Sequence, residues 1–138
     1  MKRNVATVIV ATGDDSPSVL GFYTLSAASV DLSPLPDATR KKLPRYGRIP
    51  AVLLGRLAVA KGMRRTGLGG LLIADAVKRA CRGEIAWAVF VVRAKHDDAV
   101  AFYRHFGFVP FEGDPLMLWI ARKAALSAIG RRITAHQA

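Results

Sequence analysis

The segment from residue 51 to residue 82 constrains the fold more than any other part of this sequence. Residues 51–60 are almost all apolar, which is typical of a buried central strand. Residues 69–82 instead repeat with a helical period, which places charged side chains on one side and apolar side chains on the other. The turn between them is rich in glycine and arginine. A buried strand that runs through such a turn into an amphipathic helix predicts a mixed α/β domain.

The rest of the chain adds further strands and one more helix to this unit. Compact runs of apolar and β-branched residues predict strands at residues 5–11, 19–29, 87–92, 108–110 and 116–120. Residues 97–106 predict a short helix that Gly107 ends, and the prolines of residues 32–50 predict an irregular path over the surface. A chain of 138 residues is long enough for one such domain, which we place at residues 1–121, followed by a basic tail at residues 122–138.

The glycine-rich turn has the composition of a phosphate-binding site. It reads Arg64-Arg65-Thr66-Gly67-Leu68-Gly69-Gly70 and stands where a strand meets the start of a helix. The first N–H groups of a helix have no partner inside it, and the helix dipole adds a partial positive charge there. An ordinary strand-to-helix loop also contains two or three glycines, but the adjacent Arg64 and Arg65 favour an anion site. The spacing fits neither a Walker A loop nor a dinucleotide-binding G-x-G-x-x-G motif.

Two motifs of this sequence resemble those of GNAT acetyltransferases. Arg64-x-x-Gly67-x-Gly69 is similar to the R/Q-x-x-G-x-G/A signature of that family, whose turn holds the pyrophosphate of coenzyme A. The run from Ala99 to Phe108 (AVAFYRHFGF) resembles the family's A-x-x-x-Y-x-x-x-G-F element. The resemblance covers residues 5–121 and implies a GNAT fold with acetyl-CoA as the acetyl donor. GNAT domains begin with a strand and two helices before the part that matches residues 5–11, so an N-terminally shortened domain is expected.

The resemblance also implies roles for individual residues. The cofactor would contact the end of the central strand and the glycine-rich turn, at Leu57, Ala58, Val59, Arg64, Arg65, Thr66, Gly67, Leu68, Gly69 and Gly70. The N–H of Val59 would polarise the thioester carbonyl, and the phenol of Tyr103 would give its proton to the departing sulfur. A helical tyrosine beside Phe102 is also typical of core packing. The sequence offers no clear general base, because Asp97 and Asp98 are equally well explained as helix caps.

The charge of the chain bears on the acceptor. The net charge is +11, and nine basic residues with no acidic residue lie between Ala38 and Arg65. Such a surface suits a polyanion such as nucleic acid, although a solvated basic loop is equally consistent with it. An α-amino group, with a pKa of about 7.7–8.0, needs less help from a general base than a lysine does. The charge and the missing base together favour an α-amine carried on a polyanion.

Three further segments are similar to the toxin branch of the GNAT family. They are Leu43-Pro44-Arg45-Tyr46, Leu54-Gly55-Arg56-Leu57-Ala58-Val59 and Val92-Arg93-Ala94-Lys95. Members of this branch acetylate the α-amino group of aminoacyl-tRNA, which blocks translation, and pair with a ribbon-helix-helix antitoxin. The branch often has V-H-A-K-D at the last of these segments. In this chain Arg93 stands in place of the histidine of that motif and His96 in place of its aspartate. The similarity implies these partners, a homodimer, and tRNA contacts at Arg40, Lys41, Lys42, Arg45, Arg48, Arg93 and Lys95.

Two other functions stay open on the sequence alone. One is a GNAT enzyme for a different amine, such as a protein N-terminus, a lysine or a metabolite, and the other is a non-catalytic nucleic-acid-binding module. The single cysteine, Cys81, allows no internal disulfide and fits a reducing cytoplasm. No apolar run approaches the roughly 18 residues that span a bilayer, so no membrane partner is expected. His96, His105 and His136 lack the spacing of metal ligands, and no metal is expected.

Overall fold

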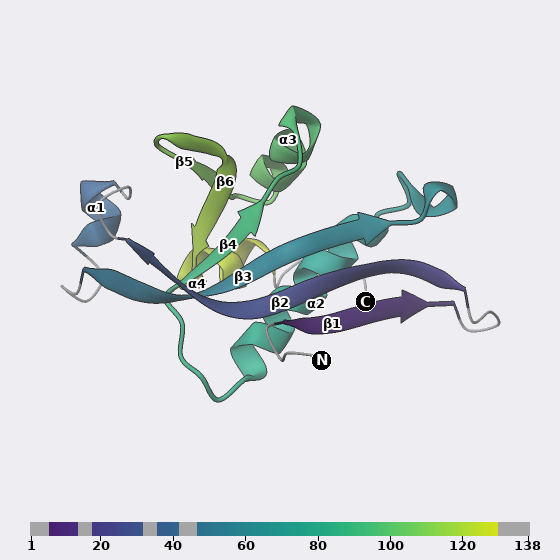
Figure 1. The fold of residues 1–138 in the computed structure, drawn as a ribbon, viewed down its shortest axis with the longest axis horizontal. Helices are drawn as coiled ribbons and strands as arrows, with labels where there is room; N and C mark the ends of the chain where they lie inside the picture. The colour runs from purple at the N-terminus through teal and green to yellow at the C-terminus, as the bar shows by residue number, and fades with distance from the viewer. Residues whose placement is uncertain (1–5, 14–17, 32–35, 42–46, 130–138) are drawn as a thin grey trace, which may run out of the picture.

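The computed structural model describes residues 6–13, 18–31, 36–41 and 47–129 and has a mixed sheet with helices packed on it (Figure 1). Within these residues the sheet has six strands in the order β1-β2-β3-β4-β6-β5. The strands are β1 (Thr7–Thr12), β2 (Val19–Asp31), β3 (Arg48–Val59), β4 (Val89–Arg93), β5 (Val109–Phe111) and β6 (Asp114–Ala121). The helices are α1 (Asp37–Arg40), the 3-10 turn η1 (Lys61–Met63), α2 (Leu68–Arg82), α3 (Asp97–His105) and α4 (Arg122–Ala128). Strands β3 and β4 run parallel, and the other neighbouring pairs are antiparallel.

The predicted strands and helices are present, and the main difference is the start of β3. It begins at Arg48 rather than at residue 51, because its first residues pair with the end of β2. Pro50 has no N–H to donate, and the strand tolerates it because that position faces β4 rather than β2. Its carbonyl points to the same side and accepts the N–H of Ala88 at 2.9 Å. Pairing with β4 starts only at Ala51. The segment 32–50 is therefore not irregular throughout, since it includes α1 and the first residues of β3.

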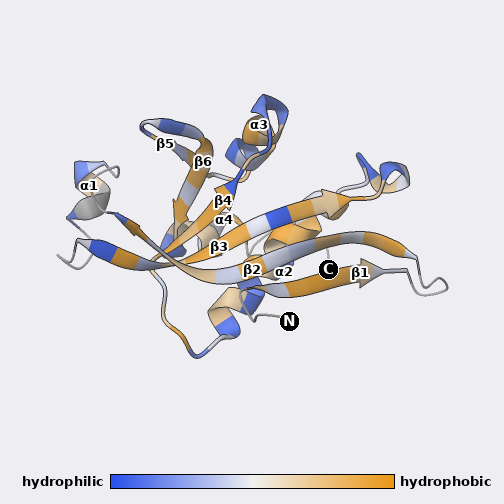
Figure 2. Cartoon of the chain, in the orientation of Figure 1, coloured by the Kyte–Doolittle hydropathy of each residue, from blue (hydrophilic) through white to orange (hydrophobic). Residues whose placement is uncertain are grey.

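Apolar side chains lie on both faces of the sheet, and Figure 2 shows the hydrophobic colour of the central strands. Helices α2, α3 and α4 pack on one face, over the larger buried cluster that includes Tyr23, Ile73 and Phe90. The second face has a smaller cluster, formed by Ile49, Ala51, Val89, Val91, Phe111 and Trp119. In Figure 1, α2 passes behind β2 and β3, so the viewer looks at this second face. Burial on both faces explains the continuous apolar runs of the two parallel strands.

Helix α4 packs as part of the folded unit. Ala125 within it and Ile129 after it are both 0% exposed and belong to the larger buried cluster. The guanidinium carbon of Arg122 lies 4.7 Å from the ring centroid of Trp87. The sequence places residues 122–129 in a basic tail, and we propose instead that the domain runs at least to Ile129. Residues 130–138 lie outside the described part. Among the helices that the structure describes, none has the length and apolarity to cross a membrane.

Candidate active site

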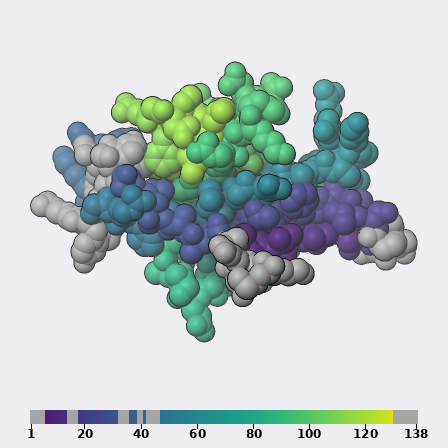
Figure 3. Space-filling model, viewed as in Figure 1, coloured from purple at the N-terminus to yellow at the C-terminus, as the bar shows by residue number. Residues whose placement is uncertain are grey.

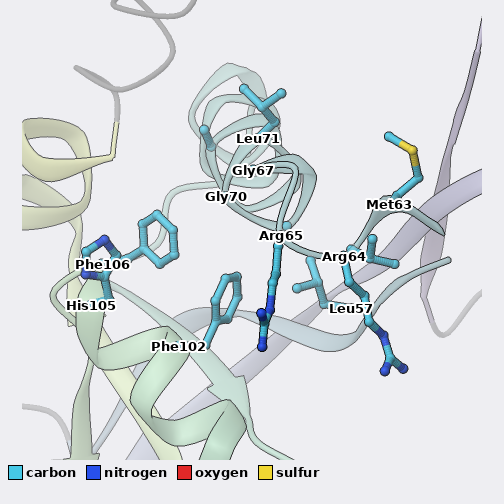
Figure 4. A pocket seen from close by; sticks show the side chains of 13 residues that line it. Leu57, Met63, Arg64, Arg65, Gly67, Gly70, Leu71, Phe102, His105 and Phe106 are labelled. Carbon is cyan, nitrogen blue, oxygen red and sulfur yellow. The ribbon is translucent and has the colours of Figure 1, made fainter. Parts of the chain in front are cut away.

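A cavity of about 730 Å³ opens where β3 ends and α2 begins. Its walls come from the end of β3, the turn that follows, the first half of α2 and one side of α3 (Figure 4). They are formed by Leu57, Val59, Met63, Arg64, Arg65, Gly67, Gly69, Gly70, Leu71, Ala74, Phe102, His105 and Phe106. In Figure 3, green atoms of α3 and teal atoms of the turn after β3 stand on either side of a recess. The cavity is therefore mainly apolar, with two arginines contributed by the turn.

The turn between β3 and α2 has a partly left-handed backbone. Gly67, which caps α2, has a φ of 88°, and Arg65 has a φ of 64°, a value that residues other than glycine seldom adopt. The hydroxyl of Thr66 donates to the carbonyl of Met63 and accepts the N–H of Leu68 at 3.4 Å. These hydrogen bonds stabilise the turn from within.

The start of α2 offers an anion-binding site. Its first helical hydrogen bond runs from the N–H of Leu71 to the carbonyl of Gly67 at 3.1 Å. Within the described part of the chain no group accepts the N–H of Gly69 or Gly70, and both glycines line the cavity. The helix dipole adds roughly half a positive charge at this end. In Figure 4 the side chain of Arg65 extends from the turn toward the α3 side of the cavity. This combination suits the phosphates of an elongated, otherwise apolar ligand.

Two aromatic rings of α3 pack directly on the glycines of α2. A Cβ atom at Gly69 would lie 3.0 Å from Cζ of Phe102, and one at Gly70 would lie 3.0 Å from Cζ of Phe106. The two rings meet edge to face, with their centroids 5.2 Å apart. Glycine at both positions therefore lets α3 approach α2 closely, and it leaves the two free N–H groups uncovered.

A β-bulge in β3 decides which side chains face the cavity. Gly55 and Arg56 stand together opposite Thr24 of β2, and the N–H of Arg56 donates to Oγ1 of Thr24 at 3.0 Å. The extra residue shifts the alternation of side chains by one position. Leu54 before the bulge and Leu57 after it consequently both face α2. Without the bulge, Leu57 would face the other side of the sheet.

Strands β3 and β4 part at the same point. They pair only along residues 51–54 of β3 and diverge beyond it (Figure 1). The N–H of Ala60 donates to the carbonyl of Leu20 on β2 at 2.8 Å. Because successive N–H groups of a strand alternate in direction, those of Leu57 and Val59 point to the side that β4 has left. Donors that are fixed and unpaired in this way can stabilise an oxyanion.

Tyr103 lies on α3 behind the aromatic wall of the cavity and does not line it. The residue is 5% exposed, and its ring meets those of Phe102 and Phe108 edge to face, at 5.4 and 5.8 Å between centroids. Its hydroxyl makes no hydrogen bond to another residue that the structure describes. Burial raises the pKa of Tyr103 to about 12, so the phenol is protonated at neutral pH. The ring is part of the core, and the hydroxyl holds an available proton.

Most residues predicted to bind the cofactor line the cavity. Those that do are Leu57, Val59, Arg64, Arg65, Gly67, Gly69 and Gly70. Ala58 alternates with its neighbours to the opposite face of β3. The hydroxyl of Thr66 is engaged within the turn, and Leu68 packs against the hydrophobic core.

The residues predicted to bind tRNA are spread over the surface. Arg48 forms an ion pair with Asp31 at 2.8 Å, and Arg93 forms one with Asp114 at 3.2 Å. These four side chains are about half exposed, so each pair is weak and can be exchanged for another anion. Lys41 and Lys95 are exposed, whereas the side chain of Arg40 and all of Lys42 and Arg45 lie outside the described residues.

Six residues that line the cavity are not predicted from the sequence. They are Met63, Leu71, Ala74, Phe102, His105 and Phe106. The sequence does carry a signal for three of them, because Phe102, His105 and Phe106 follow the i, i+3, i+4 spacing of one helix face. That face has the pattern of ordinary core, and only the position of α2 makes it a cavity wall, so spacing alone does not mark it as one.

Comparisons with known proteins agree with this geometry. Residues 6–110 match the family described as acetyltransferase (GNAT) domain. A tRNA-acetylating toxin of Mycobacterium tuberculosis is 39% identical over 114 residues, which are 81% of this chain and 68% of that protein. The probable toxin TacT of Sinorhizobium fredii is 29% identical over 138 residues, covering 94% of this chain and 76% of TacT.

Solved structures of similar proteins have the same fold. AtaT in complex with acetyl-methionyl-tRNAfMet superposes with a TM-score of 0.78 at 28% identity, over 87% of this chain and 73% of AtaT. A mutant of KacT, in which a tyrosine is replaced by phenylalanine, superposes with a TM-score of 0.79 at 29% identity, over 89% of this chain and 75% of KacT. The chain belongs to the GNAT acetyltransferase family. Its similarity within the family is to the toxin branch, so the predicted fold and family are both confirmed.

Proposed function

We propose that this protein is a toxin that transfers the acetyl group of acetyl-CoA to the α-amino group of an aminoacyl-tRNA. One observation carries the proposal. A single cavity joins the N–H groups of Gly69 and Gly70 to the end of β3 and the N–H groups of Leu57 and Val59, and none of these four has a partner among the described residues. That arrangement fits a long donor with a diphosphate at one end and a thioester at the other. Among the relatives are a tRNA-acetylating toxin, AtaT with acetyl-methionyl-tRNAfMet, and AtaTR bound with AcCoA.

The diphosphate would bind at the start of α2. The N–H groups of Gly69 and Gly70 donate to its oxygens, and the helix dipole favours its charge. Arg65 would pair with the same phosphates from the turn, and Arg64 lines the cavity beside it. The apolar walls of the cavity suit the pantetheine chain that leads from the phosphates to the sulfur. The aromatic wall of α3 limits how far that chain can move sideways.

The chemistry would take place where β3 leaves β4. The amine nitrogen bonds to the acetyl carbon, the carbon–sulfur bond breaks, the amine loses a proton and the sulfur gains one. The N–H of Val59, with that of Leu57 near it, would donate to the carbonyl oxygen as its negative charge grows. One such donor contributes about 3–4 kcal/mol to transition-state stabilisation in other acyl-transfer enzymes.

Tyr103 is the residue that we assign to the leaving sulfur. A thiol has a pKa of about 8.5, so a phenol whose pKa burial raises to about 12 stabilises the thiolate first as a hydrogen-bond donor. The proton that the amine releases balances the reaction. Tyr103 does not line the cavity, so this role requires the sulfur to come past Phe102, whose ring meets that of Tyr103 edge to face.

The relatives also support a protein partner. AtaT has been solved with the C-terminus of the antitoxin AtaR, and KacTA as a complex with DNA. We infer that this chain is silenced by a cognate antitoxin of the ribbon-helix-helix type, that it acts as a homodimer, and that it works in the cytoplasm, where charged tRNA is found. We assign the catalytic unit to residues 1–121 together with α4.

The direct test is transfer of a labelled acetyl group. Purified protein is incubated with labelled acetyl-CoA and charged tRNA, and in parallel with deacylated tRNA, free amino acids and lysine peptides. Label is expected only on charged tRNA, and mild alkali should release it as an N-acetyl amino acid. Label on peptides or free amines alone would identify a GNAT enzyme with another acceptor. Binding of tRNA without binding of acetyl-CoA would identify a non-catalytic module.

A further inference from the structure

We propose that Arg56, together with Arg93, binds a backbone phosphate of the acceptor nucleic acid on the face of the sheet opposite to the cofactor cavity. The proposal rests on the function proposed above and adds to it the place where the acceptor enters. It depends on the bulge in β3, on the register between β3 and β4, and on the charges available at the point where these strands part.

The bulge places Arg56 on the face opposite to the cavity. Leu57 faces α2, because it pairs with the buried Tyr23 and lines the cavity. Arg56 stands opposite Thr24, which alternates with Tyr23 and therefore faces away from α2. A Cβ at Gly55 would lie 3.0 Å from Oγ1 of Thr24, which places the bulge on that same face. The exposed side chain of Arg56 thus extends from the surface that faces the viewer in Figure 1.

The register brings Arg93 close to this position. Leu54 pairs with Val92, so the next residue of β4, Arg93, is level with the beginning of the bulge. Arg93 alternates with Val92, which lies in the larger buried cluster under the helices, and so faces the same side as Arg56. The two guanidinium groups therefore belong to the two strands that part here, on one face of the sheet.

The two arginines differ in whether their guanidinium groups are already paired with an acidic side chain. The guanidinium of Arg56 has no hydrogen bond or ion pair with another residue of the described structure. Arg93 is paired with Asp114 at 3.2 Å, but both side chains are about half exposed, and a pair of this kind contributes little. A phosphate can therefore bind Arg56 directly and draw Arg93 from Asp114, with a bidentate contact to each guanidinium.

The direction of approach explains why an acceptor would need such a site. The donor fills the cavity on the α2 face, so the amine must reach the acetyl carbon from the other face, through the gap between β3 and β4. An aminoacyl group is carried by the terminal nucleotide of a tRNA, and the phosphate of that nucleotide is separated from the amine by the amino acid and the ribose. Guanidinium groups beside the gap are therefore in position to hold that phosphate while the amine enters.

The test compares Arg56→Gln with Arg82→Gln. Arg82 is also exposed, but it ends α2, about 20 Å along the helix from the phosphate-binding end. Binding of deacylated tRNA is measured by fluorescence over a range of salt concentrations, and the acetyl-CoA affinity of each variant is measured alongside. Arg56→Gln should weaken tRNA binding about five- to tenfold at low salt and reduce the salt slope by about 0.7, the value for one single-strand phosphate. Arg82→Gln should change the slope by less, and neither variant should alter the acetyl-CoA affinity.

A second substitution at Arg56 keeps the positive charge but removes the planar guanidinium group. Arg56→Lys should restore the salt slope but only part of the affinity, because lysine cannot make the bidentate contact. If Arg56→Gln and Arg82→Gln weaken tRNA binding equally, or if wild-type protein does not bind tRNA, the Arg56 site is rejected. If the wild type acetylates charged tRNA but Arg56→Gln and Arg82→Gln bind tRNA equally well, the Arg56 site is rejected and the proposed enzymatic function stands. If Arg56→Gln shows the binding defect and no acetyl transfer occurs in the wild type, only the enzymatic function fails.

Discussion

The backbone N–H of Arg56 donates to Oγ1 of Thr24 over 3.0 Å, across two strands whose residues are 32 positions apart in the sequence. This hydrogen bond holds the bulge of β3. The bulge turns Leu57 and Val59 toward the cavity and Arg56 toward the opposite face. One side-chain hydroxyl thereby supports both the donor side and the acceptor side of the proposed active site.

Replacing Thr24 with valine should lower kcat more than it lowers stability. Valine has nearly the same shape but leaves the Arg56 N–H without its acceptor, which costs about 0.5–1.5 kcal/mol of folding free energy. The bulge would then relax, and misplaced N–H donors at Leu57 and Val59 should reduce kcat about tenfold. Steady-state kinetics and thermal unfolding measure the two effects. Thr24→Ser keeps the hydroxyl and should recover most of kcat, so equal rates for the valine and serine variants would contradict this role.

Gly67→Ala should weaken acetyl-CoA binding, whereas Gly113→Ala should not. Both glycines have a positive φ, of 88° and 84°, and a Cβ on either would meet no atom within 4 Å. The two variants therefore carry the same backbone cost, about 1–2 kcal/mol, without a steric clash. Only Gly67 lies in the phosphate-binding turn, so only its replacement should raise the dissociation constant for acetyl-CoA, by about tenfold. Calorimetry measures the binding and thermal unfolding the stability. An equal loss of affinity in both variants would assign the effect to general destabilisation.

The sequence predicts the elements of this fold well and the bulge not at all. The central strand, the turn and α2 follow from a local apolar run, a glycine cluster and a helical period, all within residues 51–82. The bulge depends on Thr24, which lies far from Arg56 in the sequence and carries no local signal. The same limit applies to Phe102 and Phe106, whose role as a cavity wall depends on the glycines of another helix.

The charged residues show a second limit of sequence reasoning. Arg48 and Arg93 read as cations free to bind tRNA, yet the fold pairs them with Asp31 and Asp114. Arg56 is one of nine basic residues between Ala38 and Arg65, and its place in a segment similar to the toxin branch does not mark it as a phosphate ligand. Its position becomes distinctive only when the strand register places it beside the gap between β3 and β4. Pairing between distant segments, rather than composition, decides which of the cations are available.

Tyr103→Phe should lower kcat by about one to three orders of magnitude and leave acetyl-CoA affinity nearly unchanged. The ring packing against Phe102 and Phe108 does not involve the hydroxyl, so the variant should fold normally. Tyr23→Phe is the matched control, since Tyr23 is also buried and its hydroxyl donates to Asp75 on α2. That variant should lose about 1 kcal/mol of stability, while its kcat should change little. Steady-state rates with charged tRNA measure the first effect and thermal unfolding the second. Comparable loss of kcat in both variants would show that Tyr103 acts through the core.

The pH dependence of the reaction should show one ascending limb and no descending limb in the alkaline range. The acceptor amine must be neutral to attack, and an α-amino group has a pKa of about 7.7–8.0, so kcat/KM should rise through that range. Tyr103 must be protonated to help the sulfur leave, and burial raises its pKa to about 12. A group whose pKa is raised in this direction keeps its proton as the pH rises, so it causes no loss of rate below about pH 11.

An unperturbed tyrosine, with a pKa of about 10, would instead reduce the rate from about pH 9 upward. Initial rates with a charged tRNA, taken over brief reactions because the aminoacyl ester hydrolyses in alkali, distinguish these cases. A descending limb between pH values of about 9 and 10 that disappears in Tyr103→Phe would show that this phenol ionises normally in the complex.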